Sequence, residues 1–225
     1  MNAAVVSLDS LLAARRLWRG QASPPPAPRE PTGHAALDAA LPGGGWPEGA
    51  VTELLLAADG IGELALLLPT LARLTQAGRP VVWVDPPYRP YIPALARAGL
   101  DLAQVHVVDT GGSESAWAIE QCLRSQACAA VLGWPLRADD RTLRRLQGAA
   151  ETGQALGFLF RPLAAARNPS PAALRLQLEP GRLQILKCRG GVARGQIPFP
   201  ADETRHGTMI PPRETGSDPA FPTRI

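Results

Sequence analysis

The chain contains little lysine, cysteine, histidine or aromatic residue. Among its 23 basic residues only Lys187 is a lysine, and aromatic residues make up 5% of the 225 residues. The three cysteines, Cys122, Cys128 and Cys188, lack CxxC spacing, and with three histidines they form no recognisable metal-binding pattern. These shortages argue against a zinc-finger protein and against a small protein stabilised by disulfides. They favour a protein located in a reducing compartment.

Long hydrophobic runs are also missing. Residues 1–20 carry Asp9 within their apolar stretch and three arginines after it, which does not match a signal peptide. No segment approaches the roughly 18 apolar residues of a membrane span. We therefore expect a cytoplasmic protein.

The distribution of residue types predicts one domain with two extensions. Hydrophobic residues make up 45% of the chain, enough for a single substantial core. We expect an amphipathic basic helix in residues 1–20, a stiff proline-rich linker in 21–31, the folded domain in 32–200 and a disordered tail in 201–225.

Residues 32–200 alternate between short apolar runs and helical patterns. Strands separated by single helices imply right-handed crossovers and a parallel sheet with helices on both faces. Near the end, leucines alternate with polar residues from Leu174 to Leu178, and Pro180-Gly181 predicts a turn before a returning strand. The sequence thus predicts an α/β fold, with a mostly parallel twisted sheet flanked by helices and ending in an antiparallel hairpin.

A degenerate phosphate-binding loop follows the first predicted strand. In the working motif G-x-x-x-x-G-K-[ST], backbone amides and the lysine hold phosphates, and the hydroxyl holds magnesium. The four defining positions are here Ala57, Gly62, Glu63 and Leu64, with Gly60 inside the loop. A carboxylate repels the triphosphate that lysine would attract, and leucine cannot bind a metal. We expect no nucleotide cofactor at this loop.

The residues before that loop carry a family resemblance. Thr32-Gly33, Leu37-Asp38 and the glycine-rich stretch from Leu41 to Gly49 stand in the order found before the phosphate loop of RecA recombinase. Over residues 32–200 the chain resembles this RecA-like core, and more closely the SulA-related ImuA family of bacterial mutagenesis cassettes. The segment Leu17-Trp18-Arg19-Gly20 resembles ImuA rather than RecA.

Two further positions depart from RecA-like ATPases. The strand that would end in a magnesium-orienting aspartate ends in Gly133-Trp134-Pro135, and Pro87 stands where a catalytic glutamate is expected. Each loss alone would cost orders of magnitude in rate. We therefore expect a protein that is not an enzyme.

Resemblance to ImuA implies a non-catalytic adaptor in error-prone translesion DNA synthesis during the SOS response to DNA damage, located at the nucleoid. Its implied partners are ImuB, which is a polymerase-like adaptor, an error-prone replicative-type polymerase and RecA. The candidate partner-binding residues lie in the first helix: Leu8, Leu11, Leu12, Arg15, Arg16 and Trp18. The alternative is that this helix packs on the chain's own core.

Several basic residues are candidates for contact with DNA or with a neighbouring subunit: Arg141, Arg144, Arg145, Arg161, Lys187 and Arg189. The first three share one face of a predicted helix. In RecA filaments, residues at the positions of Lys187 and Arg189 reach a nucleotide across the subunit interface. Because no aromatic residues are interleaved, we expect weak, salt-sensitive DNA binding. The alternative is an ordinary solvated face.

Two other functions remain open. One is a SulA-type inhibitor of cell division, a RecA-like protein that binds the division GTPase without nucleotide chemistry. SulA-type proteins are generally shorter, so the first helix and the tail favour ImuA. The other is a dinucleotide-binding enzyme, because the residues from Gly60 to Ala65 fit G-x-G-x-x-[GA] and Asp85 ends the next strand.

Overall fold

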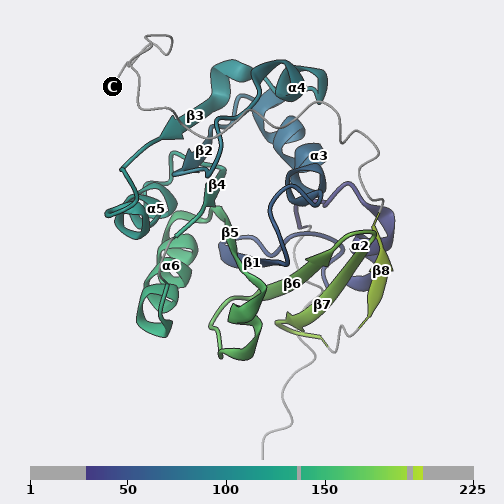
Figure 1. Ribbon diagram of the computed structural model, residues 1–225. Helices are drawn as coiled ribbons and strands as arrows, with labels where there is room; N and C mark the ends of the chain where they lie inside the picture. The colour runs from purple at the N-terminus through teal and green to yellow at the C-terminus, as the bar shows by residue number, and fades with distance from the viewer. Residues whose placement is uncertain (1–28, 136–137, 192–194, 200–225) are drawn as a thin grey trace, which may run out of the picture.

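One twisted sheet with helices on both faces forms the body of the protein (Figure 1). The computed structural model describes residues 29–135, 138–191 and 195–199. In this part the strands are β1 (Ala50–Leu56), β2 (Val81–Val84), β3 (Val105–Val108), β4 (Ala130–Gly133), β5 (Leu156–Pro162), β6 (Leu174–Glu179), β7 (Arg182–Cys188) and β8 (Gln196–Pro198). The helices are α2 (Ala35–Ala40), α3 (Glu63–Gln76), α4 (Ile92–Arg97), α5 (Ser115–Arg124) and α6 (Asp140–Gly153), with 3-10 turns η1 (Leu102–Gln104) and η2 (Leu163–Arg167).

The strand pairing confirms the predicted fold class. In the sheet order β3-β2-β4-β5-β1-β6-β7-β8, all pairs from β3 to β6 are parallel. β6 and β7 form the expected antiparallel hairpin, and β8 adds a short further strand beside β7. β7 is therefore not the edge strand of the described sheet.

Side chains of the central strands pack into two separate cores, one on each face of the sheet. Successive residues of a strand point to opposite faces, so Leu54 packs into the cluster beneath α3 and α4, whereas Val51 packs beneath α5 and α6. Figure 1 shows α5 and α6 together on one side of the sheet and α3 on the other. The central strands are buried on both faces, as the apolar runs of the sequence predict.

The strand order argues against the dinucleotide-binding alternative. In that fold the first and second strands are neighbours, because the order is 3-2-1-4-5-6. Here β1 lies between β5 and β6, and two strands separate it from β2. The glycine pattern after β1 therefore arises in a different topology.

A buried tryptophan attaches the segment before β1 to the body. Trp46 is fully buried and packs edge-to-face on Phe158, with ring centroids 5.1 Å apart. Its indole N–H donates to the Thr70 hydroxyl at 2.9 Å, and that hydroxyl donates to the carbonyl oxygen of Pro31 at 2.9 Å. The glycine-rich stretch therefore acts as a structural connection between α2, α3 and the sheet.

The centre of the sheet contains a buried charge cluster of Glu53, Arg161 and Arg175. Glu53 on β1 is completely buried, and its carboxylate accepts hydrogen bonds from Arg161 on β5 and from Arg175 on β6. Arg161 also donates to the Ala138 carbonyl at 2.8 Å, and Arg175 donates to the Ala165 carbonyl at 2.8 Å. One carboxylate thus connects three adjacent strands, the segment before α6 and η2.

Several expectations fall outside the described residues. Residues 1–28 and 200–225 contain the predicted first helix, most of the linker and the tail, so these domain boundaries stay predictions. Within the described ranges, no helix is long and apolar enough to cross a membrane, and no group of three or more His, Cys, Asp or Glu side chains is placed to hold a metal ion.

We predict that Glu53→Gln strongly destabilises the fold. The substitution leaves two buried guanidinium groups without a counter-charge, a change that costs about 3–5 kcal/mol in comparable clusters. The free energy of unfolding is measured by urea titration. As a matched control, Glu179→Gln removes the more exposed pair with Arg182 and should cost less than about 1 kcal/mol. Equal losses for the two variants would contradict this view of Glu53.

Candidate functional site

The carboxyl ends of the parallel strands meet at one edge of the sheet, where open α/β sheets usually bind ligands. We call this edge the carboxyl-terminal rim. It consists of the loops that follow β1, β2, β3 and β4: residues 57–62, 85–91, 109–114 and 134–139, of which 136–137 lie outside the described residues.

The Glu63 carboxylate is hydrogen-bonded to backbone amides of the degenerate phosphate loop. Its two carboxylate oxygens accept hydrogen bonds from the Gly60 amide at 2.8 Å and the Ile61 amide at 2.9 Å. In a working phosphate loop, such amides face the phosphate. The chain's own anion therefore satisfies these donors, and its negative charge disfavours a second anion beside it.

The remaining loop positions have structural roles. Gly62 precedes α3 with a φ of 105°, a conformation that favours glycine, and Phe199 packs close over it. Leu64 packs against the core on the α3 side, and Ala57 and Gly60 are exposed. The Glu63 carboxylate bonds the loop before α3 and not the first turn of the helix itself.

Aromatic packing replaces the missing carboxylate at the end of β4. Trp134 stacks on Phe160 with ring centroids 4.2 Å apart and an angle of 4° between the rings. Trp83 on β2 also lies beside Trp134, and the centroids of the two rings are 6.0 Å apart. This part of the rim therefore offers apolar rings where a magnesium site needs oxygen ligands.

Asp85 connects two loops of the rim. Its backbone has a φ of 48°, and its carboxylate accepts hydrogen bonds from the Thr110 amide at 2.7 Å and the Thr110 hydroxyl at 2.5 Å. The carboxylate holds the loop after β3 against the end of β2. Because both carboxylate oxygens of Asp85 already accept hydrogen bonds from Thr110, this carboxylate is not placed as a ribose-binding group would be.

Two exposed aromatic side chains mark the rim. Tyr88 follows β2 and is 42% exposed, and its hydroxyl donates to Asp59 at 3.5 Å, which links two of the loops. Trp117 in the first turn of α5 is 57% exposed. Large exposed aromatic residues are typical of protein-binding surfaces.

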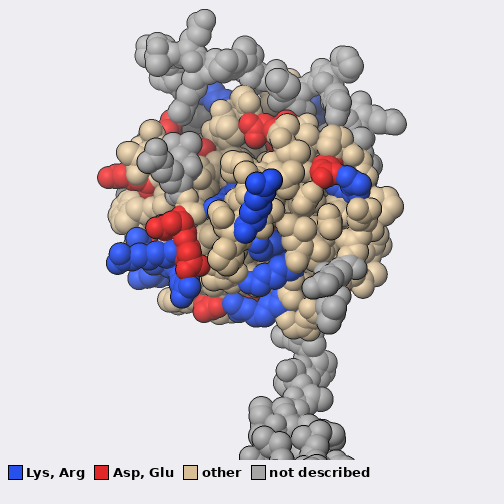
Figure 2. Space-filling model, turned by 60° about the horizontal axis from the view of Figure 1, so that its bottom comes forward, with Lys and Arg blue, Asp and Glu red and all other residues tan. Residues whose placement is uncertain are grey.

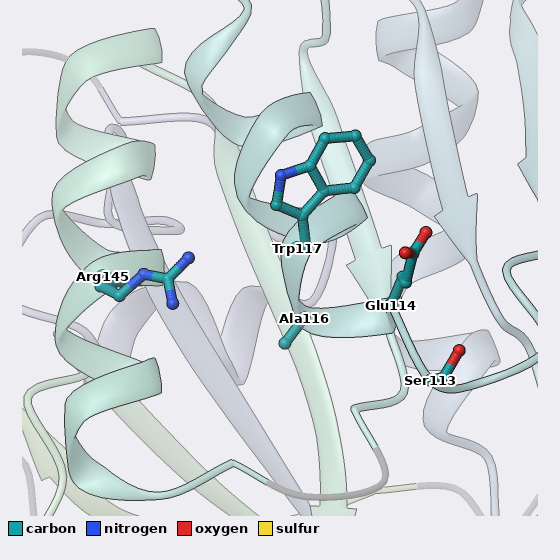
Figure 3. A pocket seen from close by; sticks show the side chains of 5 residues that line it. All are labelled: Ser113, Glu114, Ala116, Trp117 and Arg145. Carbon is teal, nitrogen blue, oxygen red and sulfur yellow. The ribbon is translucent and has the colours of Figure 1, made fainter.

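Trp117 borders an open hollow between α5 and α6, lined by Ser113, Glu114, Ala116, Trp117 and Arg145 (Figure 3). Figure 3 shows Arg145 reaching from α6 toward α5, while Trp117 projects from the start of α5. Arg145 forms an ion pair with Glu120, which also accepts a hydrogen bond from Arg124 at 2.9 Å. The hollow thus combines an apolar ring with a fixed positive group.

The arginine face of α6 is largely paired. Arg145 contacts Glu120, Arg144 pairs with Asp140 at 2.6 Å, and Arg141 is exposed. At the start of this helix the Thr142 amide, bonded to the Asp139 carboxylate, holds the pKa of Asp139 below its usual value. Figure 2 shows acidic side chains directly beside basic ones at the lower left of the molecule. DNA contact by this face stays a prediction, with less free positive charge than the sequence alone indicates.

The other basic candidates are in different environments. Arg161 is 9% exposed and bound to Glu53, so the expectation that it contacts DNA or a subunit is corrected: its guanidinium serves the buried charge cluster. Lys187 donates to the Ser170 carbonyl at 2.6 Å, and burial lowers the pKa of this ammonium, with Arg175 and Arg189 lowering it further. Arg189 is exposed, 3.4 Å from Glu151.

The partner-binding residues expected in the first helix lie outside the described residues: Leu8, Leu11, Leu12, Arg15, Arg16 and Trp18. Their role stays a prediction. Sequence analysis missed Tyr88 and Trp117. One signal was available for Trp117, because it falls outside the stripe formed by the buried Ser115, Ala118 and Ile119 of α5.

The comparisons with known proteins agree on one family. The family model "Cell division inhibitor SulA" matches residues 49–157. The chain is 36% identical to the cell division inhibitor SulA of Edwardsiella piscicida over 118 residues, which cover 49% of this chain and 69% of that protein. The chain belongs to the SulA family. It is also 32% identical to SulA of Photorhabdus laumondii over 114 residues, covering 50% of this chain and 64% of that protein.

A solved structure, SulA from Pseudomonas aeruginosa, is similar at a TM-score of 0.42 and 24% identity, covering 49% of this chain and 97% of that chain. The fold assignment rests on the strand order described above.

The family assignment corrects the main functional interpretation. The sequence suggested an ImuA-type adaptor in translesion synthesis, but the matched proteins are cell division inhibitors, which supports the SulA-type alternative. The error came from weighing residues 1–20 and the tail, which lie outside the matched range of 49–157. The expected contacts with ImuB, an error-prone polymerase and RecA are untested.

We predict that isothermal titration of the protein with Mg-ATP gives no heat of binding. Glu63 already bonds the loop amides, and leucine and tryptophan stand at the metal-binding positions. A RecA-type ATPase titrated under the same conditions is the control. A saturable heat signal with micromolar affinity would show that the rim still accepts a nucleotide.

Proposed function

We propose that this protein is a non-catalytic inhibitor of cell division, and that it acts by binding the division GTPase. The observation that supports this most is its similarity to proteins described as cell division inhibitors, at 36% identity over 118 residues. A place in the SOS response to DNA damage is consistent with the SulA family. The proposal includes no chemical step on a nucleotide.

The carboxyl-terminal rim is the surface that we propose for the GTPase. Its two exposed aromatic side chains, Tyr88 and Trp117, supply rigid apolar area at low entropic cost. The contacts of Asp85 with Thr110 and of Tyr88 with Asp59 hold the loops in place before binding. A surface that is ordered in advance loses less entropy when a partner binds.

Positive charge beside the aromatic residues suits an acidic partner surface. Arg89 is exposed in the same loop as Tyr88, whereas Arg145 at the hollow next to Trp117 is already paired with Glu120. Charges at the margin of an interface mainly raise the rate of association. We therefore expect association with the GTPase to slow as ionic strength rises.

Expression in a bacterium that carries a compatible division GTPase tests the function. We predict long undivided filaments with normally segregated nucleoids, because division fails while growth continues. Microscopy measures cell length, and mutation frequency in the same cultures measures any effect on mutagenesis. Normal cell length at confirmed expression of folded protein would contradict the proposed function.

A double variant tests the rim separately. Tyr88→Ala with Trp117→Ala should abolish filamentation, since loss of one aromatic hot spot commonly costs about 2 kcal/mol, or roughly 30-fold in affinity. The thermal unfolding midpoint should be nearly unchanged. Leu102→Ala is the matched control, because Leu102 is 36% exposed but precedes β3 at the opposite edge of the sheet. Filaments with the double variant would place the interface elsewhere and leave the function itself standing.

A further inference from the structure

Cys122 and Cys128 come together although six positions separate them in the sequence. Cys122 lies in the last turns of α5, and Cys128 lies just before β4. Between them, Gln126 adopts a φ of 61°, which reverses the chain after the helix. As a result the two thiols lie close enough to shift each other's pKa, and both are free and half-buried.

Ser125 fixes the geometry of this pair. Its hydroxyl donates to the Cys122 carbonyl at 2.8 Å and lies 3.6 Å from the Cys128 sulfur. It also accepts a hydrogen bond from the Ala127 amide at 3.2 Å. The reversal is therefore an ordered turn that holds the Cys128 sulfur beside the end of α5.

Reagents can reach Cys128 from solvent. Cys128 lines a surface hollow with Arg79 and Pro80 on one side and Gln154 on the other. Because these residues precede β2 and β5, the hollow lies at the edge of the sheet opposite to the carboxyl-terminal rim. Oxidation at this site is thus spatially separate from the proposed GTPase-binding surface.

We propose that Cys122 and Cys128 form an oxidation site for hydroperoxides, in which Cys128 is oxidised first and Cys122 resolves the product as a disulfide. In the first step the Cys128 thiolate attacks a peroxide oxygen, the O–O bond breaks, and the leaving oxygen takes a proton to give an alcohol or water. Cys128 becomes a sulfenic acid and the peroxide is reduced.

In the second step the sulfur of Cys122 attacks the sulfur of Cys128. The S–O bond breaks, and the departing hydroxide takes the thiol proton of Cys122 and leaves as water. Overall, two thiols and one hydroperoxide give one disulfide, one alcohol or water, and one water. The disulfide formed has an S–S bond of about 2.05 Å.

The electrostatics support this order of events. The hydrogen bond from Cys122 lowers the pKa of Cys128 to about 6, and the nearby Ser125 hydroxyl lowers it further against the effect of burial. The same contact, followed by burial, raises the pKa of Cys122. Burial raises the pKa of Cys188 above its ordinary value of 9.0. At neutral pH the thiolate is therefore concentrated on Cys128, and acidification below about pH 6 removes it.

Peptide mapping of the peroxide-treated full chain tests the proposal directly. Trypsin cuts after Arg124, so Cys122 and Cys128 fall on separate peptides that only a disulfide can join. We expect this linked pair after stoichiometric hydrogen peroxide, and its loss after reduction. Cys188→Ser is the matched control and should give the same linked pair.

Two measurements distinguish the roles of the cysteines. In Cys122→Ser, dimedone should trap a sulfenic acid on Cys128. In the unmodified chain, iodoacetamide at pH 7 should alkylate Cys128 at least about tenfold faster than Cys188, with the difference shrinking as the pH falls below 6. The thermal unfolding of each variant confirms that it is folded. Absence of the linked pair in the folded, unmodified chain, or preferential oxidation of Cys188, would overturn the proposal.

Discussion

The buried carboxylate of Glu53 is the constraint on which most of the structure depends. It lies in the central strand β1 and binds guanidinium groups from the strands on both sides. Through Arg161 it also reaches the Ala138 carbonyl in the loop after β4, and through Arg175 it reaches η2. A buried ion cluster of this kind costs desolvation energy, so its value lies more in fixing the register of the strands and the position of the loops than in added stability.

At the carboxyl-terminal rim, contacts within the chain stand where a nucleotide site would need free groups. Glu63 bonds the loop amides, Trp134 and Phe160 stack where a metal-orienting carboxylate would be, and Asp85 fastens the neighbouring loop. The rim presents exposed aromatic side chains, which suits recognition of a protein.

The fold was predictable from the sequence because it depends on local periodicity. Apolar runs and helical patterns gave the central strands and helices, and Pro180-Gly181 gave the hairpin turn. The charge cluster was not predictable, because Arg175 stands in an alternating strand that looks half-exposed from the sequence, and its further contacts are with η2 and the residue after it. The proximity of Cys122 and Cys128 depends on a left-handed conformation at Gln126. Such a conformation is usually predicted from a glycine, and the sequence has none at this position. Function required comparison with known proteins, since the resemblance to ImuA depended partly on residues outside the matched core.

The central claim is that a SulA-family protein without nucleotide chemistry blocks division by binding the division GTPase. Sedimentation of the purified GTPase, assembled with GTP in the presence of increasing amounts of the purified chain, tests it most directly. The account predicts that pelletable polymer falls as the chain is added, without ATP and in proportion to complex formation. Undiminished polymer at a saturating amount of folded protein, together with binding of the chain to an ImuB-type adaptor, would contradict it.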